Sequence, residues 1–409
     1  MREASVRRLD GFGDRVADVT LVLAPLLAFN VFQLPGIVRL ATILLAILLV
    51  FIFIRTPGAR VPHWELVLTA LLALSIMWSD APNYTSERMR THLPLVLSAV
   101  LAASILPPER ILRCVRLAFG VIMASSLLII LFDPDTRARA GSTDLVLTAQ
   151  FSKNVYGGLL VIALILILER RRPYNFVLVA VLAVLIGYNQ SVTAWVTAVF
   201  LAAASLASRP IITRLGPRAA RPVLAIMVAC GLGAIGAFLS ADATSALDTV
   251  GKDPTLGLRT QIWAASWEQI KLAPGLGHGA FAFLDAASNS PVTQFVWARF
   301  QGYQPPHPHN GLIDLAGQLG LAGVVVYAGL VATGIGRGIG PALHGSAPAR
   351  TSVLCMAFIV IFGVTEPTYL GSWLILMVTF AGMADHRHTS LARAPSTSIP
   401  TLPEELMPR

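Results

Sequence analysis

Pro305-Pro306-His307-Pro308-His309-Asn310-Gly311-Leu312-Ile313 stands directly before a long apolar run. Proline fixes φ and has no backbone N–H, so the three prolines exclude a helix before His309. Asn310 has the side chain of a helix N-cap, and the glycines between Gly317 and Gly323 suit close packing of helices. The stretch therefore predicts a stiff arm that holds two histidines at the mouth of a membrane-spanning helix.

The composition indicates an integral membrane protein. The 409 residues are 55% hydrophobic and only 13% charged, with a mean hydropathy of +0.69. Soluble domains carry about 25% charged residues. The net charge of +9 would suit nucleic acid. Its arginines, however, lie in short segments between apolar runs, as in a protein whose partner is the lipid bilayer. We therefore expect no nucleic acid partner.

The apolar runs predict an all-α polytopic fold. A helix needs about 20 apolar residues to cross the bilayer. Residues 1–384 are predicted to form one integral-membrane domain with about twelve transmembrane helices, of which 93–106 and 352–365 are the shortest. The predicted spans are 17–34, 37–54, 64–79, 93–106, 111–132, 154–169, 174–189, 191–208, 222–239, 310–333, 352–365 and 368–384.

The orientation follows from the arginines. If both termini are cytoplasmic, 21 of the 31 basic residues lie on inner segments. Basic residues concentrate on the cytoplasmic side of membrane proteins. No cleavage site follows the first apolar run, so we expect that run to be retained. His309 is thereby predicted to face the exterior.

One long connection, residues 240–309, separates the ninth and tenth spans. Its many aromatic residues predict an ordered external loop. Within it, Thr260–Leu272 is expected to form a helix with Trp263, Trp267 and Ile270 on one face. The tail at 385–409 is rich in Pro, Ser and Thr, and we expect it to be disordered and cytoplasmic.

His309 is the candidate general base, because imidazole titrates near neutral pH. The alternative is a histidine that only caps a span. His307, between two prolines, is assigned a positioning role with Asn310. His307 and His309 could together bind a metal ion, because residues i and i+2 of an extended strand lie on one face. No nearby Asp, Glu or Cys is expected to complete such a site, so we predict that no metal ion is bound.

Basic residues on the outer side predict an anionic ligand. Arg259 can clamp a phosphate with two hydrogen bonds or anchor a helix at the membrane interface. Lys153, Arg137 and Arg139 lie at the entrance to another span, and together these charges suit a diphosphate. Glu366 is the carboxylate near membrane depth on this side, and it is expected to pair with an arginine in a structural or catalytic role.

Four motifs in this order resemble the O-antigen ligase and polysaccharide polymerase family of bacterial membrane glycosyltransferases. The resemblance covers about residues 60–384. The motifs are Ser152-Lys153-Asn154-x-x-Gly157; Ser191-x-Thr193-Ala194-Trp195; Gly257-Leu258-Arg259-Thr260-x-x-Trp263 with Pro274-Gly275-x-Gly277-x-Gly279-x-Phe281; and His309-Asn310 with its glycine-rich helix.

The resemblance implies a GT-C-like helical enzyme of the bacterial inner membrane with a periplasmic active site. Such enzymes take glycan from an undecaprenyl diphosphate carrier and pass it to a saccharide or to lipid A core. They use no cofactor and no metal ion, by an inverting displacement. By this resemblance His309 activates the acceptor, while Arg259 and Lys153 hold the diphosphate.

One departure from the family pattern bears on whether the enzyme is a ligase or a polymerase. Ligases commonly carry an arginine in the Ser-x-Thr-Ala segment, where this chain has Val192 and Thr193. This favours a polysaccharide polymerase slightly over a lipid A-core ligase. A secondary transporter of an anionic solute is the alternative from another class. Transporters usually place ionisable groups at the membrane midplane, and the predicted spans are almost free of charge.

Overall fold

The computed structural model describes residues 2–29, 35–56, 59–132, 153–170, 175–189, 191–240, 255–300 and 304–384. Every regular element in these ranges is a helix, as the apolar runs predict. In chain order the helices are α1 (Arg2–Ala28), α2 (Pro35–Arg55), α3 (His63–Leu74), η1 (Ser75–Trp78), α4 (Pro82–Ile105), α5 (Pro108–Phe132), α7 (Lys153–Leu168), α8 (Asn175–Tyr188), α9 (Val192–Ser240), α11 (Thr255–Ile270), η2 (Ala286–Ser288), α12 (Pro291–Trp297), α13 (Gly311–Leu343), α14 (Ala347–Gly363) and α15 (Ser372–Met383).

Each of the twelve predicted spans overlaps one of these helices, but several boundaries were wrong. The predicted spans 93–106 and 352–365 are the apolar parts of the longer helices α4 and α14. The spans predicted at 191–208 and 222–239 are the two arms of α9, which turns back at Gly216 with φ 74°. A hydropathy pattern marks where a helix is apolar, and the helix itself continues into polar residues at its ends.

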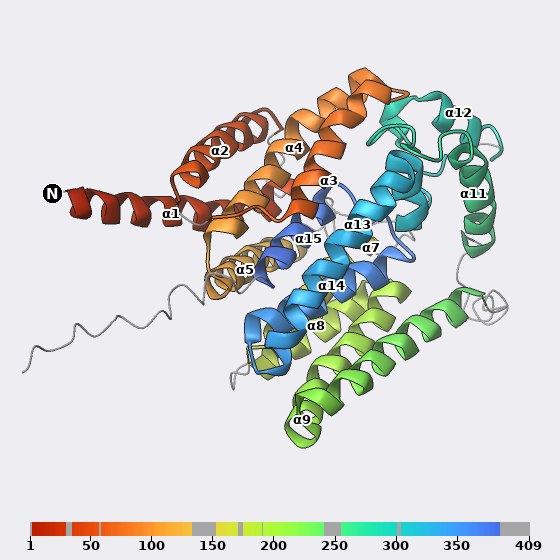
Figure 1. The fold of residues 1–409 in the computed structure, drawn as a ribbon. Coiled ribbons are helices and arrows are strands. Elements are labelled where there is room, and N and C mark those ends of the chain that lie inside the picture. Colours follow the sequence, from red (N-terminus) through yellow and green to blue (C-terminus); the bar gives the residue numbers. More distant parts are fainter. Residues whose placement is uncertain are drawn as a thin grey trace, which may run out of the picture.

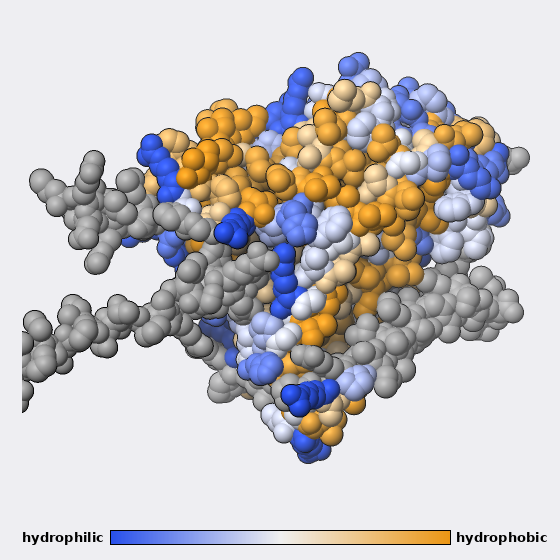
Figure 2. All heavy atoms as spheres, in the orientation of Figure 1, coloured by the Kyte–Doolittle hydropathy of each residue, from blue (hydrophilic) through white to orange (hydrophobic). Residues whose placement is uncertain are grey.

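Three helices of the described chain are long and apolar enough to cross a membrane, namely 108–128 in α5, 192–216 in α9 and α13. Five shorter apolar helices accompany them. The crossing of the membrane by all twelve segments thus stays a prediction. Exposed apolar side chains mark a lipid-facing surface: Ile47 and Ile54 of α2 are 63% and 76% exposed, and Val184 of α8 is 70% exposed. Figure 2 shows hydrophobic residues over much of the middle of one face.

The core of the bundle is one hydrophobic cluster, in which inward side chains of α1, α4, α5, α7, α13, α14 and α15 are buried. Figure 1 shows α11 and α12 at one end of this bundle, beside the beginning of α13. They have a small core of their own, which includes Ile262, Phe283 and Val296. The described part of the long connection is therefore folded, as its aromatic content predicts.

Helix α13 is interrupted at Gly320, which has φ 63° and ψ −162°. The sequence predicted an unbroken helix with a glycine face. Backbone groups freed by such a break need partners, because water is absent at membrane depth. The loop at 274–279 supplies them. Gly317 and Gln318 accept hydrogen bonds from the amides of His278 and Gly279 (both 2.9 Å), and the amides of Leu321 and Ala322 donate to Pro274 (2.8 Å) and Gly275 (3.0 Å).

The glycines on both sides of this interruption are required by close packing. A Cβ on Gly320 would lie 2.4 Å from the carbonyl oxygen of Gly275. A Cβ on Gly277 would lie 2.6 Å from the backbone of Gln318, and one on Gly317 would lie 2.3 Å from the ring of Phe283. The glycine-rich stretches before and after His309 therefore form one interlocked unit.

Candidate functional site

The arm at 305–310 is held by two tryptophans. Trp297 Nε1 donates to the carbonyl oxygen of Pro305 at 3.0 Å, and Trp263 Nε1 donates to that of Pro308 at 2.7 Å. Trp263 belongs to α11, which was predicted as Thr260–Leu272 and in fact begins at Thr255. Trp267, predicted on the same face, is instead 53% exposed. The segment 255–300 thus fixes the backbone on either side of the histidines.

His309 takes a left-handed backbone conformation with φ 51°, which is rare for a residue with a side chain. Strain of this kind costs about 1–3 kcal/mol and often marks a functional site. The next residue, Asn310, accepts hydrogen bonds from the amides of Leu312 at 3.0 Å and Ile313 at 3.1 Å. The predicted N-cap is therefore confirmed, and the helix begins directly after the histidine.

His307 supports His309 from the side. The backbone N–H of His309 donates to His307 Nδ1 at 3.3 Å, and the two rings meet edge to face with centroids 4.1 Å apart. Burial lowers the pKa of His307 well below its ordinary value, and the nearby charges of His309 and Arg259 lower it further. His307 is therefore neutral at neutral pH, with Nδ1 free to accept this hydrogen bond.

Glu366 brings the predicted residues together. It lies in the turn between α14 and α15, and its side chain is only 6% exposed. Its Oε1 is 3.6 Å from Arg259 Nη2, and its Oε2 is 3.8 Å from His309 Nδ1. Gly311 makes this approach possible, because a Cβ there would lie 3.0 Å from the carbonyl oxygen of Gly363 and 3.1 Å from that of Glu366.

Two residues that the sequence did not place in the site stand behind Glu366. Asn154 Nδ2 donates to Glu366 Oε1 at 2.6 Å, and Ser191 Oγ donates to Asn154 Oδ1 at 3.0 Å. Their positions in the Lys153-Asn154-x-x-Gly157 and Ser191-x-Thr193-Ala194 motifs were the available signal. Gly157 lets α7 approach α9, since a Cβ on it would lie 2.7 Å from that of Ala194.

The other predicted phosphate ligands are only partly described. Lys153 is the first residue of α7, next to Asn154, and the structure describes its backbone alone. Arg137 and Arg139 lie outside the described residues. Arg259, in contrast, is in place beside the histidine arm, and its side chain is 16% exposed.

Two nitrogen atoms of the site are buried and lack a hydrogen-bond partner, namely Arg259 Nε and His309 Nδ1. Buried polar atoms without partners are uncommon in native proteins, and each calls for a physical explanation. A bound anion would satisfy Arg259. A small shift of the Glu366 carboxylate would satisfy His309.

The geometry removes one reason for predicting a metal-free site. His307, His309 and Glu366 each offer a ligand atom, and these atoms lie within 4.8 Å of one another. The prediction that no acidic residue completes the histidine pair was therefore wrong, since Glu366 reaches it from the turn between α14 and α15. The guanidinium of Arg259 beside the same carboxylate opposes a second positive charge there. The absence of a metal ion thus stays a prediction.

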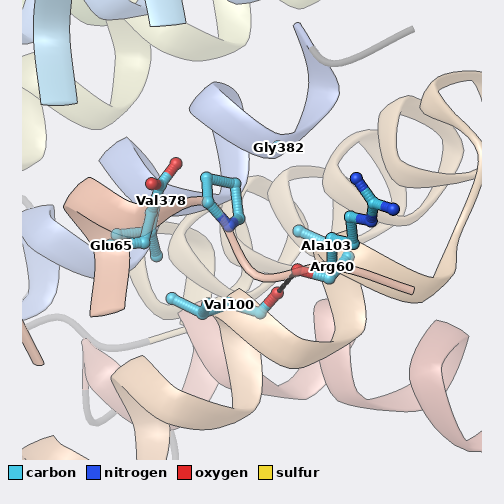
Figure 3. Close-up of a pocket in the computed structure, with 8 residues that line it drawn as sticks. Arg60, Glu65, Val100, Ala103, Val378 and Gly382 are labelled. Atoms are coloured by element: carbon cyan, nitrogen blue, oxygen red, sulfur yellow. Dashed lines mark hydrogen bonds between the residues drawn. The ribbon is translucent and has the colours of Figure 1, made fainter. Parts of the chain in front are cut away.

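A small pocket elsewhere in the bundle does not belong to this site. This pocket is partly open. It lies among α3, α4 and α15, is lined by Arg60, Glu65 and Val378 among others, and has a volume of about 20 Å³ (Figure 3). A cavity of this size holds a single water molecule. The candidate site is instead the cluster of Arg259, His309 and Glu366.

Comparison with known proteins supports the resemblance seen in the sequence. No curated protein sequence is significantly similar to this chain. Residues 145–328, however, match the O-antigen ligase family. The matched range includes Asn154, Ser191, Arg259 and His309, and it ends before Glu366. The match confirms the resemblance of this chain to the O-antigen ligase and polymerase family, whose characteristic segment runs here from 145 to 328.

Proposed function

We propose that the protein is a membrane glycosyltransferase that transfers or polymerises glycan from an undecaprenyl-diphosphate-linked donor at the periplasmic face of the inner membrane. The family match over residues 145–328 and the apolar helices support an O-antigen ligase-type bacterial membrane enzyme. The observation that carries the finer proposal is the cluster of Arg259, Glu366 and His309, with its two unpaired buried nitrogens.

In this mechanism His309 is the general base. Its Nδ1 faces Glu366, so Nε2 is left to take the proton from the acceptor hydroxyl. The acceptor oxygen then forms a bond to the anomeric carbon of the donor, and the bond from that carbon to the diphosphate oxygen breaks. The electron pair leaves with the diphosphate, and the configuration at the anomeric carbon is inverted. Glu366 stabilises the positive charge that His309 acquires.

Arg259 stabilises the departing diphosphate. A guanidinium presents parallel N–H groups that match phosphate oxygens, and Nε and Nη of Arg259 are available for this role. Lys153, Arg137 and Arg139 are proposed as further ligands of the diphosphate, on the sequence argument given above. Oriented positive charge at a leaving group is worth roughly 10²–10³-fold in rate.

The Ser191-x-Thr193-Ala194 segment slightly favours a polymerase over a ligase. Thr193 stands where ligases commonly carry an arginine, and its Oγ1 accepts a hydrogen bond from Thr365 Oγ1 at 3.2 Å. Thr193 therefore joins α9 to the Glu366 turn and offers no positive charge to a lipid A-core acceptor. The proposed acceptor is a second lipid-linked saccharide.

The decisive experiment compares His309→Ala with the unmodified protein in two assays, donor binding and glycan transfer. Transfer should fall by about two to four orders of magnitude, as removal of a general base usually causes, while donor binding persists. His307→Ala should lose less. Normal transfer by His309→Ala would leave a histidine that only caps α13.

Metal independence and topology are tested separately. Chelation by EDTA should leave transfer by the purified protein unchanged; loss of transfer in EDTA with recovery in a divalent ion would assign His307, His309 and Glu366 as ligands. A periplasm-active reporter fused after Ser288 should be active and one fused after Arg218 silent. Activity at Arg218 would place the site on the cytoplasmic side.

A further inference from the structure

Two sequence motifs that the proposed mechanism leaves unexplained meet behind Glu366. Asn154 is in the first turn of α7, and Ser191 directly precedes α9. The amide of Ala194 donates to Ser191 Oγ at 3.4 Å, Ser191 Oγ donates to Asn154 Oδ1 at 3.0 Å, and Asn154 Nδ2 donates to Glu366 Oε1 at 2.6 Å. The hydrogen bonds thus form one chain, in which every donor points toward the carboxylate.

We propose that Asn154 and Ser191 are positioning residues that hold Glu366 against His309, and that they thereby set the rate and the pH profile of glycan transfer. This inference rests on the proposed function. Neither residue contacts the reacting atoms in the mechanism above. Both act through Glu366.

Ser191 determines which way the Asn154 amide points. Because the Ser191 hydroxyl donates to Oδ1, the NH₂ group is turned to Glu366. The opposite orientation would place the amide oxygen against the carboxylate, which is repulsive. The chain also starts at the N-terminus of α9, where the helix dipole is positive and favours a nearby negative charge.

The arrangement matters most when the donor is bound. Glu366 Oε1 faces both Asn154 and Arg259, while Oε2 faces His309. In the proposed mechanism a diphosphate competes with Glu366 for the guanidinium of Arg259. Asn154 then remains as the contact that keeps Oε2 directed at His309. Outer partners of this kind typically contribute 10–100-fold to the activity of the groups that they orient.

The alternative is that this corner only fastens α7 to α9. The structure provides a matched control for that role, because Thr193 joins α9 to Thr365 at the same corner without touching Glu366. A purely structural loss of packing should therefore look alike in Thr193→Val and in the variants of Asn154 and Ser191.

The experiment measures thermal stability, donor binding and the pH dependence of kcat for Asn154→Asp, Asn154→Ala, Ser191→Ala and Thr193→Val. In Asn154→Asp two carboxylates face each other, so one takes up a proton more readily. The acid limb of kcat should then move to higher pH by about one unit or more, and kcat at neutral pH should fall about 10–100-fold. Asn154→Ala and Ser191→Ala should shift in the same direction by less, with donor binding kept. Thr193→Val should keep the original pH profile.

The outcomes separate this inference from the proposed function. An unshifted pH profile in Asn154→Ala and Ser191→Ala, together with inactive His309→Ala, would overturn the positioning role and leave the mechanism intact. Normal transfer by His309→Ala would overturn both. If Asn154→Asp does not fold, Ser191→Ala decides, since it removes only one hydroxyl.

Discussion

Two buried glutamates at opposite ends of the same helices show what separates a structural ion pair from a site. Glu169 directly follows α7 and pairs with Arg350 in the first turn of α14, whereas Glu366 follows α14 and contacts Asn154 at the start of α7. The two ends of α7 are about 22 Å apart at 1.5 Å per residue. Figure 1 shows α7 and α14 crossing the centre of the bundle.

At the Glu169 end every group is closely paired. Arg350 Nε lies 2.5 Å from Glu169 Oε2, and Ser205 Oγ donates to Oε1 at 2.7 Å. The side chains of Glu169 and Arg350 are 0% and 9% exposed. This cluster fastens α7, α9 and α14 to one another.

At the Glu366 end the guanidinium and the imidazole stand further from the carboxylate. Arg259 and His309 remain 3.6 and 3.8 Å from the carboxylate, and Arg259 Nε and His309 Nδ1 have no partner. His309 also has strained backbone geometry. Both carboxylates are buried, and the candidate site differs from the structural ion pair in the longer distances from its carboxylate to Arg259 and His309.

The largest expected effect is on stability at the Glu169 end. Arg350→Ala leaves Glu169 buried without its cation and should lower the free energy of unfolding by about 3–5 kcal/mol. Thermal unfolding in detergent measures this, and transfer per folded molecule should be unchanged. The double variant Glu169→Gln/Arg350→Met should recover most of the loss. If Arg350→Ala were as stable as the unmodified protein, the Glu169–Arg350 pair would not be the structural ion pair that separates this end of α7 from the Glu366 end.

At the Glu366 end the effect should be on transfer. Arg259→Lys keeps the charge and loses the paired N–H geometry, so transfer should fall by roughly 10²–10³-fold. Thermal stability should change little, because Arg259 is only loosely paired. Arg299→Lys is the matched control on the same segment, residues 255–300. Equal transfer by Arg259→Lys and Arg299→Lys would contradict the role of Arg259.

A smaller effect is expected on pH-dependent stability. Burial, followed by the charges of His309 and Arg259, holds the pKa of His307 below its ordinary value. As the pH falls below that ordinary value, the unfolded chain binds a proton that the folded chain does not, so stability decreases. The change is at most about 1.4 kcal/mol per pH unit.

The measurement is the thermal midpoint between pH 7.5 and 5 for the unmodified protein and His307→Asn. The variant should lose less stability on acidification, because asparagine can accept the same backbone hydrogen bond without titrating. Parallel curves for the two proteins would show that His307 is not held neutral in the folded state.

The smallest effect is expected at an exposed ion pair. Arg299 Nη2 lies 2.8 Å from Glu268 Oε2, but the two side chains are 44% and 48% exposed. Water screens such pairs, so Arg299→Ala should change stability by less than about 1 kcal/mol. Chemical or thermal unfolding provides the value. If Arg299→Ala lost as much stability as Arg350→Ala, solvent exposure would not determine how much these ion pairs contribute to stability.

The sequence by itself determined the features that depend on neighbouring residues. The apolar runs located the helices, because a helix that crosses the bilayer needs about 20 consecutive apolar residues. The prolines and Asn310 predicted the arm and its N-cap, which the structure confirms. His309 and Arg259 could be singled out by residue type and motif order.

Only the tertiary structure decided what these residues meet. Glu366 is 212 positions from Asn154, and Gly275 and Gly320 interlock only where α13 is broken. Such contacts depend on how closely helices approach, and glycines at Gly157 and Gly311 permit that approach. Hydropathy carries no information about it, since a glycine in an apolar run has the same local pattern whether it faces lipid or another backbone. The carboxylate that joins the site was therefore visible in the sequence, while its partners were fixed by packing.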